Sequence, residues 1–403
     1  MKLGIYGGTF NPPHLGHVTA ARFAMDALGL DKLLLIPAAH PPHKELPQDG
    51  PGPEDRLAMA GIAADLLLLP GRVEASGMEL ERPGRSYTAE TLRQIHEEYP
   101  GAELWLLMGA DMFLTLQHWR EPETILSLAG VCAFARTQDD CGDAFAVQAE
   151  FLKTTFHARV CTIQLPQIVD ISSTQLRERL AQGEGQEFLP PSIYGYIIRK
   201  GLYGVHMDLK HLPDRELRAC SYSMMRAKRI AHVRGCEEEA VRLARRWGAD
   251  PEKAARAGIL HDCTKYLEME EQLQLCAKYG IVLDELERSA VKLLHSKTGA
   301  CVARDVFGAD EEVFAAIYWH TTGKADMALL DKILYMADYM EPNRDFDGVE
   351  RLRKLAYEDL DAAVIAGCET SIQEMEDRGL EVHKNTLAAR EWLLSKRKGT
   401  SDS

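Results

Sequence analysis

The sequence predicts two domains, a doubly wound α/β domain followed by an all-α domain. With 403 residues the chain is long for a single hydrophobic core. In the first half, short apolar runs that are typical of buried strands alternate with helical patterns, whereas from about Asp214 the apolar period is helical almost throughout. We therefore expect domains at residues 1–203 and 214–395, joined by a linker at 204–213 and followed by a polar tail at 396–403.

The composition describes an ordinary globular protein. Hydrophobic residues make up 46% and charged residues 27%, and the net charge of −14 argues against a nucleic-acid coat or a basic membrane-binding patch, though not against nucleotide substrates. The nine cysteines form no C-x-x-C pair and predict no disulfide framework, which favours a reducing cytoplasm. No apolar run approaches the ~20 residues that span a bilayer. Since the first residues lead straight into a strand, we also expect no signal peptide.

The elements of the first half follow in order from their apolar patterns. Uninterrupted apolar runs predict strands buried on both faces, and a 3.6-residue period predicts the helices between them. The strands are expected at 3–6, 32–36, 72–74, 103–107 and 131–136, with helices at 18–28 and 55–69 and a closing helix near 190–198. In the second half, Asp250-Pro251 marks the start of a helix that reaches His261.

A glycine-rich turn joins the first strand to the first helix. Gly7 and Gly8 let a ligand approach the backbone, and the following helix start offers free amides, which together favour phosphate. His14 and His17 lie three residues apart and share a face if the helix has begun there. Their imidazole N–H groups can stabilise charge during nucleotidyl transfer. A dinucleotide-binding fingerprint is disfavoured, because it uses no paired histidines and its third glycine is absent.

A second phosphate-binding end is predicted late in the first half. Ser172 and Gln175 form a capping box, so a helix starts there with its first amides available. Ser173 and Thr174 add donors, and Arg177 is expected to hold the β- and γ-phosphates because a guanidinium binds two oxygens and keeps its charge.

Two further segments carry candidate ligand contacts. The paired prolines before His43 and Lys44 predict a rigid extended loop whose cationic groups can face an anion. Ser86 is expected to cap a helix that begins beside Tyr87 and Thr88.

These motifs resemble the bacterial nicotinate-nucleotide adenylyltransferases, members of a superfamily with an H-x-G-H motif on a doubly wound α/β fold. The resemblance implies that a mononucleotide phosphate is joined to the α-phosphate of ATP with magnesium, releasing pyrophosphate. It places His14, His17, Lys44 and Arg177 in catalysis, Gly7, Gly8, Thr9, Phe10, Ser172, Ser173 and Thr174 at ATP, and His43, Tyr87, Thr88, Gly109, Asp111 and Trp119 at the mononucleotide, with Trp119 stacked on the pyridine ring. Nicotinate mononucleotide is the expected acceptor. Nicotinamide mononucleotide and phosphopantetheine remain alternatives, since the sequence does not separate acid from amide.

In the second half, the residues that carry chemistry are scattered histidines and aspartates. The candidates for metal ligands are His232, His261, Asp262, His295, His320 and Asp338. Each alone is more often an ordinary core or surface residue, but neutral imidazoles and carboxylates together suit borderline transition metals.

His261-Asp262, followed by Lys265, resembles the HD phosphohydrolase superfamily. The segments 320–324 and 335–346 narrow the likeness to the bacterial HD family that cleaves diadenosine tetraphosphate symmetrically into two ADP. The resemblance implies one or two divalent ions, with Lys265 and Arg344 at the phosphates. Iron or manganese is the expected metal, and cobalt and nickel stay open because they accept the same ligands. Two alternatives stay open: hydrolysis of another nucleotide, or a metal-bound sensing module that regulates the first domain. No nucleic-acid or membrane partner is expected, and the oligomeric state is left undetermined.

Overall fold

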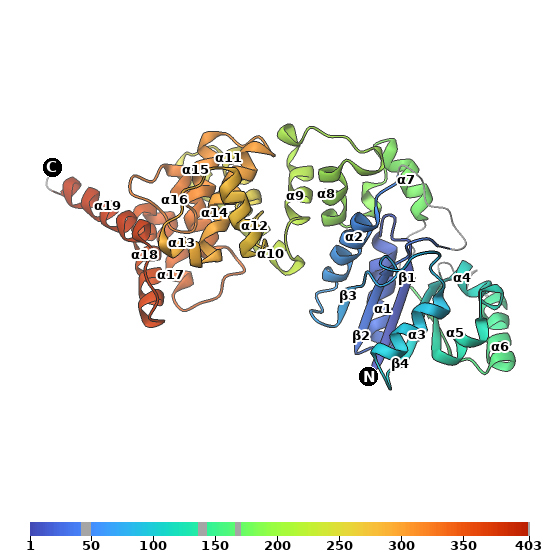
Figure 1. Ribbon diagram of the computed structural model, residues 1–403. Coiled ribbons are helices and arrows are strands. Elements are labelled where there is room, and N and C mark those ends of the chain that lie inside the picture. Colours follow the sequence, from blue (N-terminus) through green and yellow to red (C-terminus); the bar gives the residue numbers. More distant parts are fainter. Residues whose placement is uncertain (42–49, 136–142, 166–170, 402–403) are drawn as a thin grey trace. The chain divides into compact units, whose positions relative to one another are not determined.

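The computed structural model describes residues 1–41, 50–135, 143–165 and 171–401. The chain divides into two compact units, Met1–His206 and Met207–Ser403 (Figure 1). The division falls within the segment 204–213 that the sequence predicts as a linker. Among the described residues, no helix is both long and apolar enough to cross a membrane.

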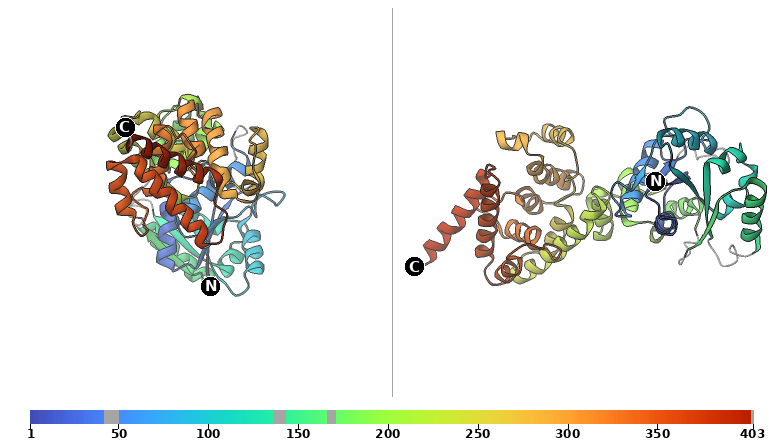
Figure 2. Two further views of the ribbon diagram at one scale, coloured as in Figure 1. Left: turned by 90° about the vertical axis from the view of Figure 1, so that its left-hand side faces the viewer. Right: turned by 90° about the horizontal axis from the view of Figure 1, so that it is seen from below.

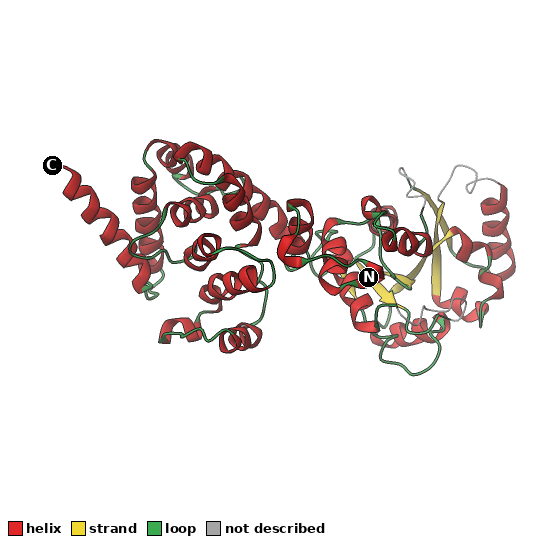
Figure 3. Cartoon of the chain, turned by 90° about the horizontal axis from the view of Figure 1, so that it is seen from above, coloured by secondary structure: helices red, strands yellow, loops and turns green. Residues whose placement is uncertain are grey.

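The first unit is built on a sheet, whose strands are yellow in Figure 3. The strands are parallel and follow the order β3-β2-β1-β4-β5-β6. Its strands are β1 (Lys2–Gly8), β2 (Lys32–Pro37), β3 (Val73–Ala75), β4 (Glu103–Gly109), β5 (Ala129–Ala135) and β6 (Val160–Gln164). Leu3 of β1 pairs with Lys32 on one side and with Leu104 on the other. The strand order therefore reverses between β1 and β4, and ligands of such sheets bind outside the carboxyl ends of the strands at that switch point.

Helices connect the strands of this sheet. They are α1 (Leu15–Leu28), α2 (Pro53–Asp65), α3 (Thr88–Glu98), α4 (Ala110–Leu114), α5 (Pro122–Leu128), α6 (Asp143–Phe156), α7 (Ser173–Ala181) and α8 (Pro191–Lys200), with short 3-10 turns at Leu116–His118, Gln186–Phe188 and Leu202–Gly204. The predicted doubly wound α/β class is confirmed. Leu3, Ile5, Leu104 and Leu106 are among the buried strand residues of a core that also includes helix residues such as Leu92.

Two of the differences from the predicted elements have a clear physical reason. The sequence predicts that α1 starts at Val18, but the helix begins at Leu15 because the His14 side chain caps it. β6 is not predicted at all, and only Ile163 of its five residues is buried. A strand at the sheet edge with few buried positions lacks the apolar run by which buried strands are recognised.

The described residues of the second unit form helices joined by loops, with no strand among them. Its helices are α9 (Asp214–Tyr222), α10 (Ala227–Trp247), α11 (Pro251–Leu260), α12 (Met269–Lys278), α13 (Glu285–Ser289), α14 (Val291–Asp305), α15 (Glu311–Trp319), α16 (Leu329–Met340), α17 (Val349–Glu358), α18 (Leu360–Asp377) and α19 (Lys384–Ser401), with a 3-10 turn at Leu209–His211. Figure 2 shows them from two further sides. The predicted all-α class is confirmed.

The helices α10 and α11 cross at close range. A Cβ added to Gly258 of α11 would lie 2.6 Å from the Cα of Glu237 in α10. Only glycine allows that approach without a shift of the backbone. The crossing matters because His232 lies on α10 and His261 follows the last residue of α11.

Candidate active sites

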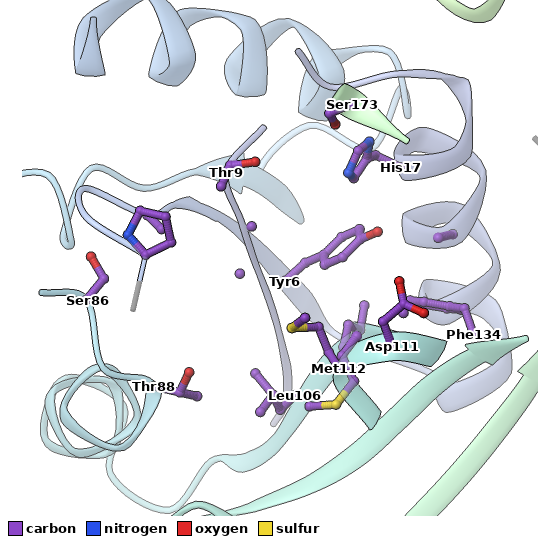
Figure 4. A pocket seen from close by; sticks show the side chains of 18 of the residues that line it. Tyr6, Thr9, His17, Ser86, Thr88, Leu106, Asp111, Met112, Phe134 and Ser173 are labelled. Atoms are coloured by element: carbon purple, nitrogen blue, oxygen red, sulfur yellow. The ribbon is translucent and has the colours of Figure 1, made fainter. Parts of the chain in front are cut away.

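A cavity of about 430 Å³ opens at the carboxyl ends of β1 and β4, in the first unit. Most of the predicted ligand residues line it: Gly7, Gly8, Thr9, His14, His17, Tyr87, Thr88, Gly109, Asp111, Trp119, Ser172 and Ser173. In Figure 4, His17 and Ser173 lie near each other, and Ser86 and Thr88 lie on the far side of the cavity. Of the remaining predictions, Phe10, Thr174 and Arg177 are not among the lining residues, and His43 and Lys44 lie outside the described residues.

The two histidines of the turn cap α1 reciprocally. The Nδ1 atom of His14 accepts a hydrogen bond from the Gly16 amide at 3.2 Å, and Nδ1 of His17 accepts one from the His14 amide at 3.2 Å. A nitrogen that accepts carries no proton, so each neutral ring carries its proton on Nε2. The ring centroids are 4.0 Å apart. The backbone thus fixes both tautomers with the proton on Nε2, and both residues line the cavity.

Phe10 has a supporting position. Its ring is fully buried and lies 5.3 Å from the ring of His17 and 5.6 Å from that of Tyr6, centroid to centroid. The ring of Phe10 packs against His17. Phe10 would therefore influence a ligand indirectly, by holding His17 in position.

Arg177 and its neighbours hold the turn after β1 against α7. The Nη1 atom of Arg177 donates to the Asn11 carbonyl at 2.8 Å, and Ser173 Oγ donates to the Pro12 carbonyl at 3.3 Å. The Tyr203 hydroxyl donates to Asn11 Oδ1 at 2.7 Å, and burial raises the pKa of Tyr203 so that it keeps this proton. The predicted capping box of Ser172 is present, with its Oγ accepting from the Gln175 amide. The two predicted phosphate-binding segments are therefore held together by hydrogen bonds.

Ser86 does not cap α3, contrary to the sequence prediction. Its Oγ accepts from the amides of Ala39 and His40, at 3.0 and 3.4 Å, and Tyr87 is the N-cap residue without a side-chain cap. The residue that the local pattern favours as a cap instead fixes the segment after β2, because its buried hydroxyl meets unpaired amides there.

Arg56 of α2 is a structural residue that sequence reasoning missed. Its side chain is 1% exposed, and it donates to the carbonyls of Thr9, Ala38 and Ala39. These carbonyls belong to the segments that follow β1 and β2, on one rim of the cavity. Burial lowers the pKa of Arg56. Since its partners lie far away in sequence, no local pattern announces it.

We expect Arg56→Met to destabilise the first unit by about 2–4 kcal/mol, because several buried carbonyls lose their donor at once. Urea unfolding of the full chain measures the change. Arg72→Met is the matched control: Arg72 also donates to two carbonyls, those of Leu30 and Asp31, but from an exposed position. Equal losses in the two variants would show that burial of Arg56 has no special effect.

The second unit brings together all six predicted metal ligands. They come from α10, the end of α11, α14, the end of α15 and α16, and are His232, His261, Asp262, His295, His320 and Asp338. On one side, His232 Nε2 lies 3.0 Å from Asp338 Oδ1 and 3.3 Å from His261 Nε2. Asp262 turns its Oδ2 toward this side, 3.4 Å from His261 Nε2.

The other carboxylate oxygen of Asp262 faces a second pair of histidines. Its Oδ1 lies 3.2 Å from His295 Nε2 and 4.0 Å from His320 Nε2, and these two nitrogens are 3.2 Å apart. Asp262 is fully buried and contacts both halves of the cluster. A carboxylate in this position can bridge two ions.

The histidines are oriented by their outer nitrogens. Nδ1 of His261, His295 and His320 each lies 2.7 to 2.8 Å from the carbonyl three residues earlier, and Nδ1 of His232 lies 3.1 Å from Glu341 Oε1. Nδ1 must carry the proton to make these bonds, which leaves the Nε2 lone pair for a ligand. Histidines that bind metals are oriented in this way.

The geometry of His295 and His320 indicates whether a cation fits between their Nε2 atoms. Burial lowers the pKa of His295, and burial and the nearby His295 and His261 lower the pKa of His320 to about 3. Both rings are therefore neutral at pH 7, with Nε2 lone pairs directed at each other across 3.2 Å. This arrangement is repulsive by itself and becomes favourable when a cation lies between the nitrogens. The donor set fits a divalent transition metal.

The carboxylates of the cluster are ionised. Burial alone would raise the pKa of Asp262, but the positive charge around it, Lys265 included, holds it well below its usual range. For Asp338, burial is likewise outweighed by the close contact with His232, so its pKa is also well below its usual range. Two permanent anions thus face four imidazoles.

Three cationic side chains border the cluster. Lys265 Nζ is 3.1 Å from Asp262 Oδ1, and Arg344 Nη2 is 2.9 Å from Asp338 Oδ1, as expected for groups near the predicted site. Arg229 was not predicted, yet its Nε donates to Asp262 Oδ2 at 2.5 Å. It lies three residues before His232, one turn away on the same face of α10, and that spacing was the available signal.

The fold and the sites define two classes of domain: an α/β domain with a histidine pair at its switch point, and a helical domain with a buried histidine and aspartate cluster. The family models agree, with a cytidylyltransferase-like model matching residues 5–179 and an HD domain model matching residues 229–343.

Each of the individual relatives matches one half of this chain. A probable nicotinate-nucleotide adenylyltransferase of Trichlorobacter lovleyi is 38% identical over 217 residues, 50% of this chain and 99% of the relative. The symmetrical bis(5'-nucleosyl)-tetraphosphatase of Bacillus subtilis is 36% identical over 181 residues, 45% of this chain and 97% of the relative. A crystal structure of a predicted HD superfamily hydrolase involved in NAD metabolism, from Clostridium acetobutylicum, is 39% identical, with a TM-score of 0.45, and covers 46% of this chain and 98% of that chain. The chain therefore belongs to the nicotinate-nucleotide adenylyltransferase family in its first half and to the HD-domain family of the tetraphosphatase in its second, which confirms both resemblances.

Proposed function

We propose that this chain is a bifunctional enzyme of the cytoplasm. The first unit transfers an adenylyl group from ATP to nicotinate mononucleotide, giving deamido-NAD and pyrophosphate. The second unit cleaves diadenosine tetraphosphate into two ADP with the help of divalent metal ions. Family membership of the two halves supports the reaction classes, and the geometry of the two sites supports the roles of the residues.

The fixed Nε2–H donors of His14 and His17 are the observation that carries the transferase proposal. The phosphate of the mononucleotide is itself the nucleophile, so no side chain needs to attack the α-phosphorus. The histidines donate to triphosphate oxygens where negative charge grows, and the first amides of α7 receive the departing pyrophosphate. ATP enters as its magnesium complex. Gly109 and Trp119 line the same cavity, and we assign them to the mononucleotide, whose phosphate would be oriented toward the α-phosphate of ATP.

Pyrophosphate release tests the acceptor. With ATP and magnesium present, we expect release with a pyridine mononucleotide and no release with phosphopantetheine. Release with phosphopantetheine alone would contradict the assignment of the first unit. A mixture without any acceptor measures background ATP hydrolysis.

The six-residue cluster around Asp262 carries the hydrolase proposal. His232, His261, Asp262 and Asp338 would hold one ion, and Asp262 with His295 and His320 would hold a second. Bound ions supply Lewis acidity that activates water and neutralises phosphate oxygens. Arg229, Lys265 and Arg344 add positive charge at the rim of the cluster and can orient the polyphosphate. We propose iron or manganese, because the donor set mixes imidazole with carboxylate.

Metal removal separates the two activities. We expect a strong chelator to abolish hydrolysis of diadenosine tetraphosphate, and iron or manganese to restore it, because the groups of metal ligands found among the described residues lie in the second unit. Adenylyl transfer should return in full on addition of magnesium alone. ADP should be the sole nucleotide product by chromatography.

A regulatory role of the second unit is the rival proposal, and the same assay decides between them. Bound iron or manganese, measured by atomic absorption, without cleavage of any dinucleoside polyphosphate would favour a sensing module over a hydrolase.

A further inference from the structure

The cavity of the first unit has an uneven distribution of charge. Among its described lining residues, Arg120 is the one arginine or lysine, whereas Glu79 and Asp111 are both acidic. Burial raises the pKa of Glu79, which weakens its negative charge. An anionic ligand that enters this cavity therefore meets one permanent cation among these residues, at Arg120.

Arg120 is held by stacking and keeps its donors available. Its guanidinium carbon lies 4.2 Å from the centroid of the Tyr87 ring. Its ion pairs with Glu90 and Glu121 are long, at 3.8 and 3.9 Å, and Glu121 instead accepts a hydrogen bond from Arg93. Within the described part of the chain, Arg120 makes no hydrogen bond through its guanidinium. A stacked guanidinium still presents its N–H groups at its edge, where a planar anion can bind.

Arg120 also has a defined place relative to the other ligand residues. It directly follows Trp119, which the family resemblance places on the pyridine ring, and it stacks on Tyr87, next to Thr88 at the start of α3. The histidine pair that would contact the triphosphate comes from the separate turn after β1. The guanidinium of Arg120 therefore lies beside the segments that we assign to the pyridine base.

We propose that Arg120 determines the preference for the acid form of the pyridine mononucleotide. The inference rests on the proposed transferase function. Nicotinate and nicotinamide differ at one ring substituent, a carboxylate or a neutral carboxamide of nearly the same shape. A pocket of fixed shape separates them poorly, but a guanidinium forms a charge-assisted and bidentate pair only with the carboxylate. Arg120 would exchange its ion pairs with Glu90 and Glu121 for the carboxylate of the ligand. Because these pairs are exposed, breaking them costs little free energy.

The test compares kcat/KM for nicotinate mononucleotide and nicotinamide mononucleotide in the wild type and in Arg120→Gln. We expect the wild type to prefer the acid, and the variant to lose about 10–100-fold of the acid-to-amide ratio. The loss should come from a lower kcat/KM for the acid, because the neutral amide forms no ion pair with the Arg120 guanidinium. Any general disturbance of Tyr87 would lower both values and leave the ratio unchanged.

Arg93→Gln is the matched control. Arg93 contacts the same Glu121 but does not line the cavity, so its removal should leave the ratio unaltered. A ratio that is the same in Arg120→Gln as in an acid-preferring wild type would overturn the proposal, as would a wild type without preference for the acid. A wild type that adenylates neither acceptor would instead overturn the transferase function on which the proposal rests.

Discussion

His17→Ala is expected to lower kcat for adenylyl transfer by about 10²–10³-fold, the usual effect of removing one donor that stabilises transition-state charge. The substitution removes the Nε2–H at the cavity and also the Nδ1 acceptor of the His14 amide. The neighbouring histidine therefore loses part of its orientation as well. KM for ATP should change less than kcat, because the developing charge is greater than the ground-state charge. Steady-state pyrophosphate release measures both constants.

The control for this prediction lies in the same chain. Hydrolysis of diadenosine tetraphosphate by the same preparation should be unchanged, because the second unit has its own core and its own ligands. His96→Ala removes an exposed histidine of α3 that does not line the cavity, and it should leave adenylyl transfer at the wild-type rate. Full transfer activity in His17→Ala would refute the proposed role of the histidine pair.

Asp262→Asn should abolish hydrolysis and reduce the bound metal. Asp262 is fully buried, and its two oxygens face the two histidine pairs. A neutral amide at this position would therefore weaken the binding of every ion that the cluster holds. We expect at least about a 100-fold loss of rate, more than the 10–100-fold effect of changes outside the ligand shell. The substitution also leaves Arg229 and Lys265 beside a neutral group, with a cost of about 3–5 kcal/mol in the free energy of unfolding. Atomic absorption and calorimetry measure the two effects.

Asp284→Asn provides the matched control for the second prediction. Asp284, Glu287 and His383 form another acidic and histidine cluster in the same unit. There, Lys297 and Lys384 already pair with the carboxylates, at 2.5 and 2.9 Å, so the charge is compensated without an ion. We expect unchanged metal content and unchanged hydrolysis. If Asp262→Asn retained its full metal content and its rate, the proposed bridging role would be wrong.

The local motifs of this chain were readable from the sequence because their partners are near neighbours. The capping box of Ser172 spans three residues and was predicted. For His14 and His17 the sequence predicted only that the two rings share a face. Their reciprocal cap, like the contact of His261 Nδ1 with the carbonyl three residues earlier, was seen first in the structure. Such contacts depend on helix geometry, which a sequence pattern encodes.

The missed features depend on contacts that are distant in sequence. Arg56 reaches the Thr9 carbonyl 47 residues away, and Ser86 reaches the Ala39 amide 47 residues away. Ser86 shows the limit most clearly, since the local pattern favoured a helix cap and the tertiary contact prevailed. The register of β1 against β2 and β4 brings these segments together, and no short motif contains that information.

We propose that one chain contains two independent active sites, and measuring the rates of both reactions in wild type, His17→Ala and Asp262→Asn tests this proposal. We expect a crossed result: His17→Ala loses adenylyl transfer and keeps hydrolysis, and Asp262→Asn loses hydrolysis and keeps adenylyl transfer. A loss of both reactions in either soluble, folded variant, or of neither, would contradict it.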